Sequence, residues 1–129
     1  MARQVIRAPN APQPIGPYSQ GIMVNGFLFV SGQVATDPTS GRLAGTDIES
    51  QTRQTLTNVR NIVEASGLSM RDLVRVSIYL KDVKDFKKMN EVYQSFFPDA
   101  PPARTTVQVE LLLPEMLIEI DAIAGRSTL

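Results

Sequence analysis

The stretch TDIESQTRQTLTNVRNIVEASGLSMRDLVRVSIYL, residues 46–80, contains the two patterns that decide the fold. In its first half, apolar residues recur at helical spacing, and Thr46 with Glu49 forms a capping box at the start. Gly67 ends this helix, because glycine readily takes the left-handed conformation found after helix ends. Residues 74–80 alternate between apolar and polar, which predicts a half-buried strand. A helix that leads into a strand indicates a fold of mixed α and β type.

Further strands and a second helix flank this stretch on both sides. Asn25-Gly26 lies between two apolar runs and is a strong hairpin signal, because both residues tolerate positive φ. The remaining expected elements are strands at 22–24, 27–34, 104–110 and 117–124, a helix at about 83–97, and a short additional strand at 4–6. Long connections through the helices place both of them on one face of the sheet. We therefore predict an α+β fold, a two-layer sandwich with a mixed sheet and two helices on one face.

Length and composition bound the class of protein. A chain of 129 residues forms a single domain, here expected over residues 1–129. Thirteen basic and thirteen acidic residues cancel, so no long-range field attracts nucleic acid or an anionic membrane. The absence of cysteine and histidine argues against disulfides, thiolate chemistry and zinc sites of the usual kind. With no signal-peptide pattern and no apolar run of about 18 residues, we expect a soluble cytoplasmic protein.

The last predicted strand carries apolar groups on both faces. One face consists of Ile118, Ile120, Ala122 and Ala124, and the other consists of Leu117, Glu119, Asp121 and Ile123. A strand of this kind is buried on both sides, yet a domain this small has no further element to cover the helix-free face. Self-association is the economical explanation.

Two charged residues are the best candidates for chemistry. Arg104 follows a pair of prolines and an alanine, and Glu119 is the single charge within residues 117–120. A planar guanidinium grips a carboxylate through two parallel hydrogen bonds, and an apolar environment raises the pKa of a glutamate towards a useful range. The alternatives are a surface arginine at a strand start and an outward-facing, solvated carboxylate.

Several separated motifs together resemble one known family. They are Ile15-Gly16-Pro17-Tyr18-Ser19-Gln20-Gly21, Ser31-Gly32-Gln33, the helix containing Asn58, Pro102-Ala103-Arg104 and Ile118-Glu119-Ile120. In this order they resemble the RidA/YjgF family of imine deaminases, over residues 6–125. The resemblance implies a chorismate-mutase-like fold of the bacillus type. It also implies a homotrimer with active sites in the clefts between subunits.

The resemblance also implies a role for each candidate residue. Arg104 binds the substrate carboxylate, while Glu119 and the backbone near Thr106 position the attacking water. Thr106 stands where many family members have cysteine, which removes any thiol role there. The residues that match the family's substrate pocket are Tyr18, Ser31, Gly32 and Asn90. A structural hydrogen bond remains an alternative for Asn90, as a plain strand kink does for Ser31-Gly32.

The function implied by the resemblance is hydrolysis of reactive 2-imino and 2-enamino acids, such as 2-aminoacrylate or 2-iminobutyrate, to 2-keto acids and ammonia. The enzyme is then a 2-iminobutanoate/2-iminopropanoate deaminase that needs neither metal nor cofactor. One alternative is a regulatory module that binds small keto or imino acids without turnover, which would need Arg104 but not Glu119. Another is the translation-inhibitor or endoribonuclease activity reported for some relatives, which zero net charge and the lack of histidine disfavour.

Overall fold

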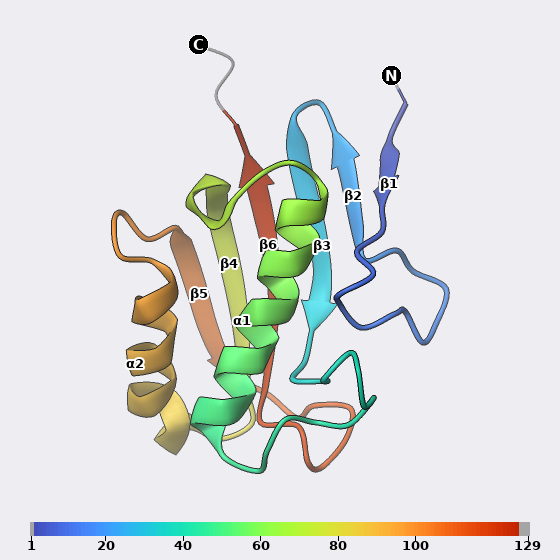
Figure 1. Ribbon diagram of the computed structural model, residues 1–129. Helices are drawn as coiled ribbons and strands as arrows, with labels where there is room; N and C mark the ends of the chain where they lie inside the picture. The colour runs from blue at the N-terminus through green and yellow to red at the C-terminus, as the bar shows by residue number, and fades with distance from the viewer. Residues whose placement is uncertain (1, 127–129) are drawn as a thin grey trace.

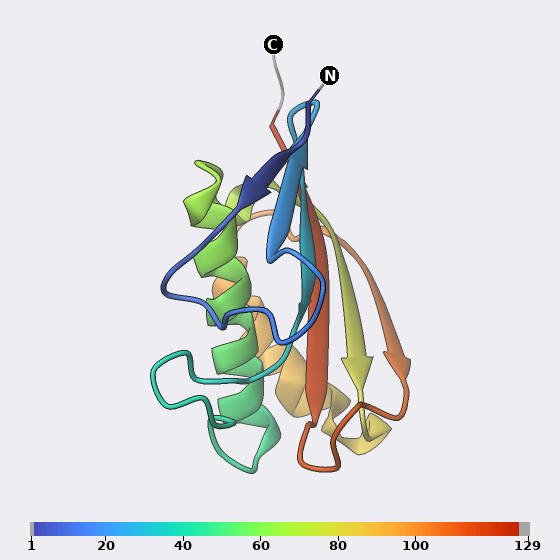
Figure 2. The same ribbon diagram turned by 90° about the vertical axis from the view of Figure 1, so that its right-hand side faces the viewer.

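The computed structural model describes residues 2–126 as a sheet of six strands with two helices on one face (Figures 1 and 2). Two short 3₁₀ turns, Met70–Asp72 and Val83–Asp85, precede β4 and α2. The elements are β1 Gln4–Ile6, β2 Gly21–Val24, β3 Phe27–Gln33, α1 Ile48–Ala65, β4 Leu73–Leu80, α2 Phe86–Phe96, β5 Ala103–Gln108 and β6 Ile118–Gly125. The predicted two-layer α+β sandwich is therefore confirmed.

The sheet is mixed, as predicted. Its strand order is β1-β2-β3-β6-β4-β5, and every neighbouring pair is antiparallel except the parallel pair β4 and β5. The last strand, β6, lies between β3 and β4, so α1 crosses over it while α2 connects two adjacent strands. Strand β5 ends at Gln108 rather than at residue 110, because β4, its partner in the sheet, ends opposite it at Leu80.

Helix α1 has a different N-terminal cap from the one predicted. The cap is Asp47, whose carboxylate accepts a hydrogen bond from the backbone N–H of Ser50 at 2.9 Å. The expected capping box of Thr46 and Glu49 is thus wrong by one residue. Aspartate caps as well as threonine does, and it directly precedes the first helical residue. At the other end the prediction is confirmed, since Gly67 has a φ of +90°.

The core lies between the helices and the sheet. Leu56, Val59 and Ile62 of α1 are completely buried there, as are Ile118 and Ile120 of β6. Because successive side chains of a strand point to opposite faces, the burial of these two isoleucines directs the residue between them to the helix-free face. The second predicted helix is shorter than expected, because residues 83–85 form a 3₁₀ turn and α2 begins at Phe86.

Two buried amides hold loops against this core. The Gln20 side chain accepts a hydrogen bond from the N–H of Ala8 at 2.6 Å and donates to the carbonyl of Pro12 at 2.9 Å, which ties the proline-rich loop before β2 into one conformation. Asn58 of α1 donates to the carbonyls of Val34 and Thr36 at 3.0 and 2.8 Å. These bonds fix the chain before β2 and after β3.

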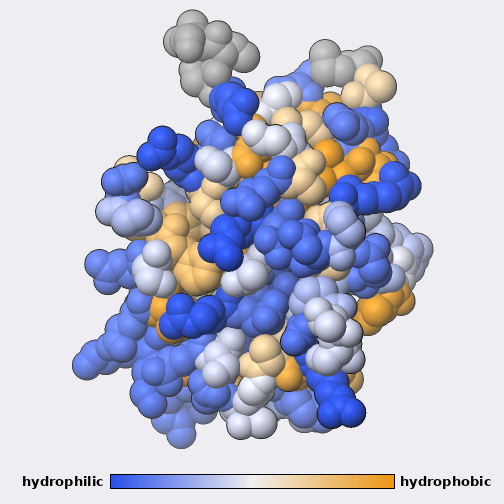
Figure 3. Space-filling view, viewed as in Figure 1, coloured by the Kyte–Doolittle hydropathy of each residue, from blue (hydrophilic) through white to orange (hydrophobic). Residues whose placement is uncertain are grey.

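The helix-covered side of the molecule, viewed in Figure 3, is predominantly hydrophilic. Within residues 2–126, neither helix has the length and apolar character needed to cross a membrane.

Candidate functional site

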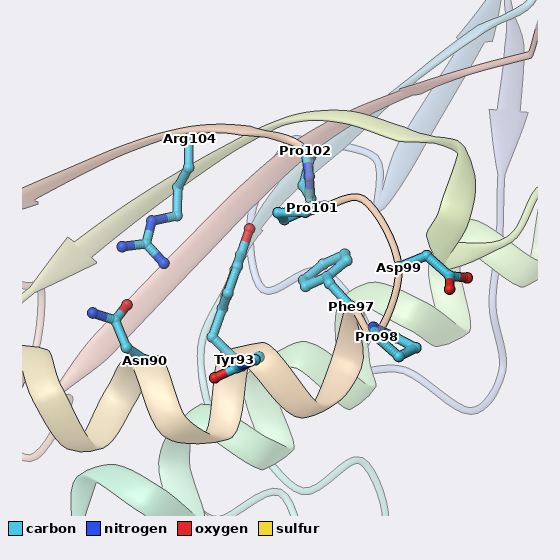
Figure 4. Close-up of a pocket in the computed structure, with 9 residues that line it drawn as sticks. Asn90, Tyr93, Phe97, Pro98, Asp99, Pro101, Pro102 and Arg104 are labelled. Carbon is cyan, nitrogen blue, oxygen red and sulfur yellow. The ribbon is translucent and has the colours of Figure 1, made fainter.

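Arg104 faces the helix layer of the sandwich. On β5 it lies in register with Val76 of β4, whose side chain is buried under the helices. The Arg104 guanidinium carbon lies 4.8 Å from the centre of the Tyr93 ring and 5.7 Å from the centre of the Phe86 ring. The two aromatic residues are seven positions apart on α2 and therefore share one helix face. Figure 4 shows the Arg104 side chain reaching from β5 towards Asn90 and Tyr93.

The Arg104 guanidinium has no carboxylate partner within the described part of the chain. The ion pairs there join Arg71 to Asp99, Lys84 to Asp82 and Arg126 to Asp72. Arg104 is nevertheless half-buried. Its N–H donors are therefore available to an anionic ligand with two acceptor oxygens.

A cavity of about 500 Å³ opens beside this guanidinium. Its walls are α2, the start of β5 and the loop 97–102 between them. The lining residues labelled in Figure 4 are Asn90, Tyr93, Phe97, Pro98, Asp99, Pro101, Pro102 and Arg104. Two side chains that line the cavity have a buried polar atom without a hydrogen-bond partner in the structure, Asn90 Oδ1 and the Tyr93 hydroxyl. Thr106 Oγ1, two positions beyond Arg104 on the same face of β5, is also buried and unpaired. Buried polar atoms rarely stay unpaired, so this region is suited to a polar ligand or water. We call Asn90, Tyr93, Arg104 and Thr106 the arginine pocket.

Glu119 lies on the opposite, helix-free face of the sheet. It is in register with Tyr79 of β4, between the buried residues Ile118 and Ile120. Partial burial raises the pKa of Glu119, and the nearby Asp121 charge acts in the same direction. The predicted upward shift of this pKa is therefore confirmed in direction. Asp121 itself accepts a hydrogen bond from the Tyr79 hydroxyl at 2.8 Å.

A bulge in β3 brings the backbone close to Glu119. The register with β6 shifts between Val30 and Gln33, so that the two residues between them, Ser31 and Gly32, leave the regular ladder. A Cβ atom on Gly32 would overlap a carboxylate oxygen of Glu119 and come within 3.1 Å of its Cδ. The absence of a Cβ on Gly32 thus allows Glu119 to approach this backbone closely. The strand kink that the sequence analysis considered for Ser31-Gly32 is also present, as the bulge.

The bulge also positions the loop that carries Tyr18. The Ser31 hydroxyl donates to the carbonyl of Ser19 at 2.5 Å, and the Ser31 N–H donates to the carbonyl of Gln20 at 2.9 Å. Tyr18 is about half-exposed, and its hydroxyl accepts a long hydrogen bond of 3.4 Å from the N–H of Ile15. We call Tyr18, Ser31, Gly32 and Glu119 the glutamate face.

The predicted site residues therefore fall into two groups within one chain. Asn90, Arg104 and Thr106 lie on the helix side, whereas the glutamate face lies on the other side of the sheet or at its edge. Sequence analysis did not identify Tyr93 and Phe86 as neighbours of Arg104. Their seven-residue spacing on the second predicted helix was the available signal. Among the described residues, no cluster of three or more histidine, cysteine, aspartate or glutamate side chains is arranged to hold a metal ion.

Comparison with known proteins places the chain in a family. The profile of the family described as endoribonuclease L-PSP matches residues 8–125. A RutC family protein of Pyrococcus horikoshii is 51% identical over 122 residues, which cover 95% of this chain and 97% of that protein. The 2-iminobutanoate/2-iminopropanoate deaminase of Salmonella typhimurium is 42% identical over 126 residues, or 95% and 98% of the two chains.

A solved structure agrees with these sequence matches. E. coli TdcF with bound serine superposes with a TM-score of 0.92 at 39% identity, covering 96% of this chain and 99% of that one. The fold and these relatives together define the class of two-layer α+β proteins of the endoribonuclease L-PSP type. The chain is a member of the endoribonuclease L-PSP family, to which the RidA/YjgF proteins belong, so the resemblance seen in the sequence is confirmed.

Proposed function

We propose that this protein hydrolyses reactive 2-imino acids and their 2-enamino tautomers to 2-keto acids and ammonia. The observation that carries the proposal is the half-buried Arg104 guanidinium, which has no carboxylate partner among the described residues and opens onto a cavity. The name of the Salmonella relative supports the imine substrate, and the serine bound to TdcF is a small ligand with a carboxylate. Substrates of the class of 2-aminoacrylate and 2-iminobutyrate fit this description.

The proposed reaction adds water across the C=N bond. Arg104 holds the substrate carboxylate through two N–H···O bonds, which fixes the imine carbon. Glu119 and the backbone near Thr106 position the water, and Glu119 accepts a proton as the oxygen bonds to the carbon. That proton passes to the nitrogen, which gives a carbinolamine. The hydroxyl proton of the carbinolamine is then transferred to the nitrogen through Glu119, the C–N bond breaks, and ammonia leaves as the carbonyl forms. The raised pKa of Glu119 suits this exchange, because a general base works best with a pKa near the operating pH.

This reaction needs the arginine pocket and the glutamate face at one substrate, although a single chain holds them on opposite sides of its sheet. We therefore propose a homotrimer whose active sites combine the arginine pocket of one subunit with the glutamate face of the next. The exposed aromatic residues of the helix-free face support this assembly. Phe27 and Phe29 of β3 are 47% and 45% exposed, and Val107 of β5 is 43% exposed. A face with this much apolar surface is suited to contact with another subunit.

Imine hydrolysis with a substrate generated in situ tests the activity. An amino-acid oxidase supplies the imine, and semicarbazide traps whatever is not hydrolysed. The wild-type protein should lower the semicarbazone signal, while Arg104→Ala should not. Arg53→Ala is the matched control, because Arg53 is an exposed arginine on α1. An unchanged signal with wild type across several amino acids would remove the enzyme hypothesis.

Mixing two inactive variants tests the shared site. Arg104→Ala and Glu119→Ala chains, unfolded and refolded together, would form trimers in which some clefts contain both intact halves. With random assembly, about a quarter of the sites should recover, because each half has an even chance of being intact. Recovery after co-refolding, but not after simple mixing of folded proteins, would support the shared site. No recovery in a co-refolded trimer of the expected mass would contradict it.

Two other functions remain open to the same assays. A module that binds keto or imino acids without turnover would bind 2-oxobutanoate through Arg104, would show no hydrolysis and would tolerate Glu119→Ala. The family description names a ribonuclease, but this chain has no histidine to serve as a base and no net charge to attract RNA. If the protein cleaved RNA and Arg104→Ala abolished this cleavage, ribonuclease activity would become the favoured function in place of imine hydrolysis.

A further inference from the structure

Tyr93 lies against the proposed carboxylate anchor, Arg104. Its side chain is 5% exposed, and its ring packs against Phe97 with centroids 4.7 Å apart and planes inclined by 40°. The Arg104 guanidinium carbon lies 4.8 Å from the centre of the same ring, and Phe86 approaches the guanidinium at 5.7 Å. Tyr93 is therefore held rigidly by α2 and Phe97, and Arg104 rests on it.

An aromatic ring holds a guanidinium in a different way from a carboxylate. The ring face attracts the cation through its quadrupole, which contributes about 0.5 to 2 kcal/mol depending on burial. The ring face does not accept hydrogen bonds from the N–H groups in the guanidinium plane, and it does not neutralise the charge of the guanidinium. A carboxylate in the same place would use the donors that a substrate needs.

We propose that Tyr93, assisted by Phe86, is the positioning residue of the site. Its ring holds the Arg104 guanidinium in the orientation that receives the substrate carboxylate. The proposal rests on the role of Arg104 in the proposed function. An arginine side chain free in water must lose rotational freedom when it binds, whereas one already resting on a fixed ring has lost most of it.

The ring of Tyr93, and not its hydroxyl, performs this role. The hydroxyl is buried and meets no partner at hydrogen-bond geometry in the structure. Burial raises its pKa, and the nearby Arg104 charge opposes this shift without reversing it. Removal of this hydroxyl leaves the face of the ring in place. Tyr93→Phe should therefore retain substrate binding, while Tyr93→Leu, which keeps apolar volume but no ring, should lose it.

The experiment compares these two variants by kinetics and by direct binding. KM and kcat are measured for imine hydrolysis, and the Kd of 2-oxobutanoate is measured by calorimetry. In Tyr93→Leu, KM and Kd should rise roughly 2- to 30-fold with little change in kcat, because binding to the carboxylate is equal in the ground and transition states. Tyr93→Phe should change either constant by less than about 2-fold.

Phe96→Leu provides a matched control for these variants. The Arg60 guanidinium lies 5.5 Å from the centre of the Phe96 ring, so this change removes a similar cation–ring contact elsewhere in the helix layer. It should leave KM and the Kd of 2-oxobutanoate unchanged. Thermal unfolding of each variant separates loss of packing from loss of positioning.

A series of fluorinated phenylalanines at position 93 keeps the shape of the ring while weakening its negative face. The Kd of 2-oxobutanoate should rise with each added fluorine, which a purely structural role would not produce. A flat series, or an unchanged Kd in a folded Tyr93→Leu protein, overturns the inference. If wild type binds 2-oxobutanoate but hydrolyses no imine, the proposed function fails and the Kd series alone decides the role of Tyr93. If wild type binds no keto acid and hydrolyses no imine, both proposals are overturned.

Discussion

Gly32→Ala should separate the stability of this protein from its activity. The added Cβ would overlap a carboxylate oxygen of Glu119, which has to move away. The colliding atoms are the far end of a flexible side chain, and the φ of Gly32 lies outside the positive region, so the backbone accepts alanine without strain. We expect the free energy of unfolding to fall by about 1 kcal/mol, the cost of one side chain forced away from its preferred rotamer.

The effect on hydrolysis should be much larger. If Glu119 positions water and transfers a proton, its displacement removes a contribution of about 10²- to 10⁴-fold in rate. Gly32→Ala should therefore lower kcat/KM at least about 10²-fold while leaving a folded protein. The effect on KM should be small, because Arg104 still binds the carboxylate.

A double-mutant cycle measures this coupling. The kcat/KM and the denaturant midpoint are determined for Gly32→Ala, Glu119→Ala and the double variant. Since both single changes remove the same carboxylate from the same place, the double variant should be no slower than Glu119→Ala. It should also regain the stability lost in Gly32→Ala, because the collision is gone. Wild-type activity in Gly32→Ala, or losses that multiply in the double variant, would refute the reasoning.

Two further predictions concern stability. Asn58→Ala would leave the partly buried carbonyls of Val34 and Thr36 without their donors, and denaturant unfolding should show a loss of about 1 to 3 kcal/mol. Glu119→Gln should raise the melting temperature at pH 7. Because the folded-state pKa of Glu119 is raised, its protonated form is favoured in the native state, and stability falls as the pH rises above about 4.3. Melting curves of wild type and Glu119→Gln should therefore converge at about pH 4, and a gap that widens on acidification would contradict the sign.

Much of the fold follows from local signals in the sequence. Helix α1 combines helical periodicity with a clear end at Gly67, and Asn25, with a φ of +52°, forms the predicted turn between β2 and β3. The cap of α1 was misplaced because Thr46 and Asp47 are both good capping residues. Only the packed position of the first helical turn decides between neighbours of this kind.

The side of the sheet on which each site residue lies was only partly predictable. For Glu119, alternation places it on the opposite face from Ile118 and Ile120. The burial of both isoleucines under the helices then identifies the face of Glu119 as the helix-free one. Strand β5 offers no such pattern. It contains Arg104-Thr105-Thr106 at the edge of the sheet, and none of its residues is fully buried. Alternation shows that Arg104 and Thr106 share a face, but packing against α2 determines which face it is.

The placement of Arg104 and Glu119 on opposite faces has a physical consequence for the proposed site. If the two side chains met within one chain, they would form an ion pair, and the arginine would lose the free donors that a substrate carboxylate requires. The sheet keeps them apart, so Arg104 rests on Tyr93 and Glu119 retains a raised pKa. In the proposed trimer they would approach each other only across a cleft between subunits, with room for a substrate and a water between them. Assembly, rather than folding of one chain, would then create the active site.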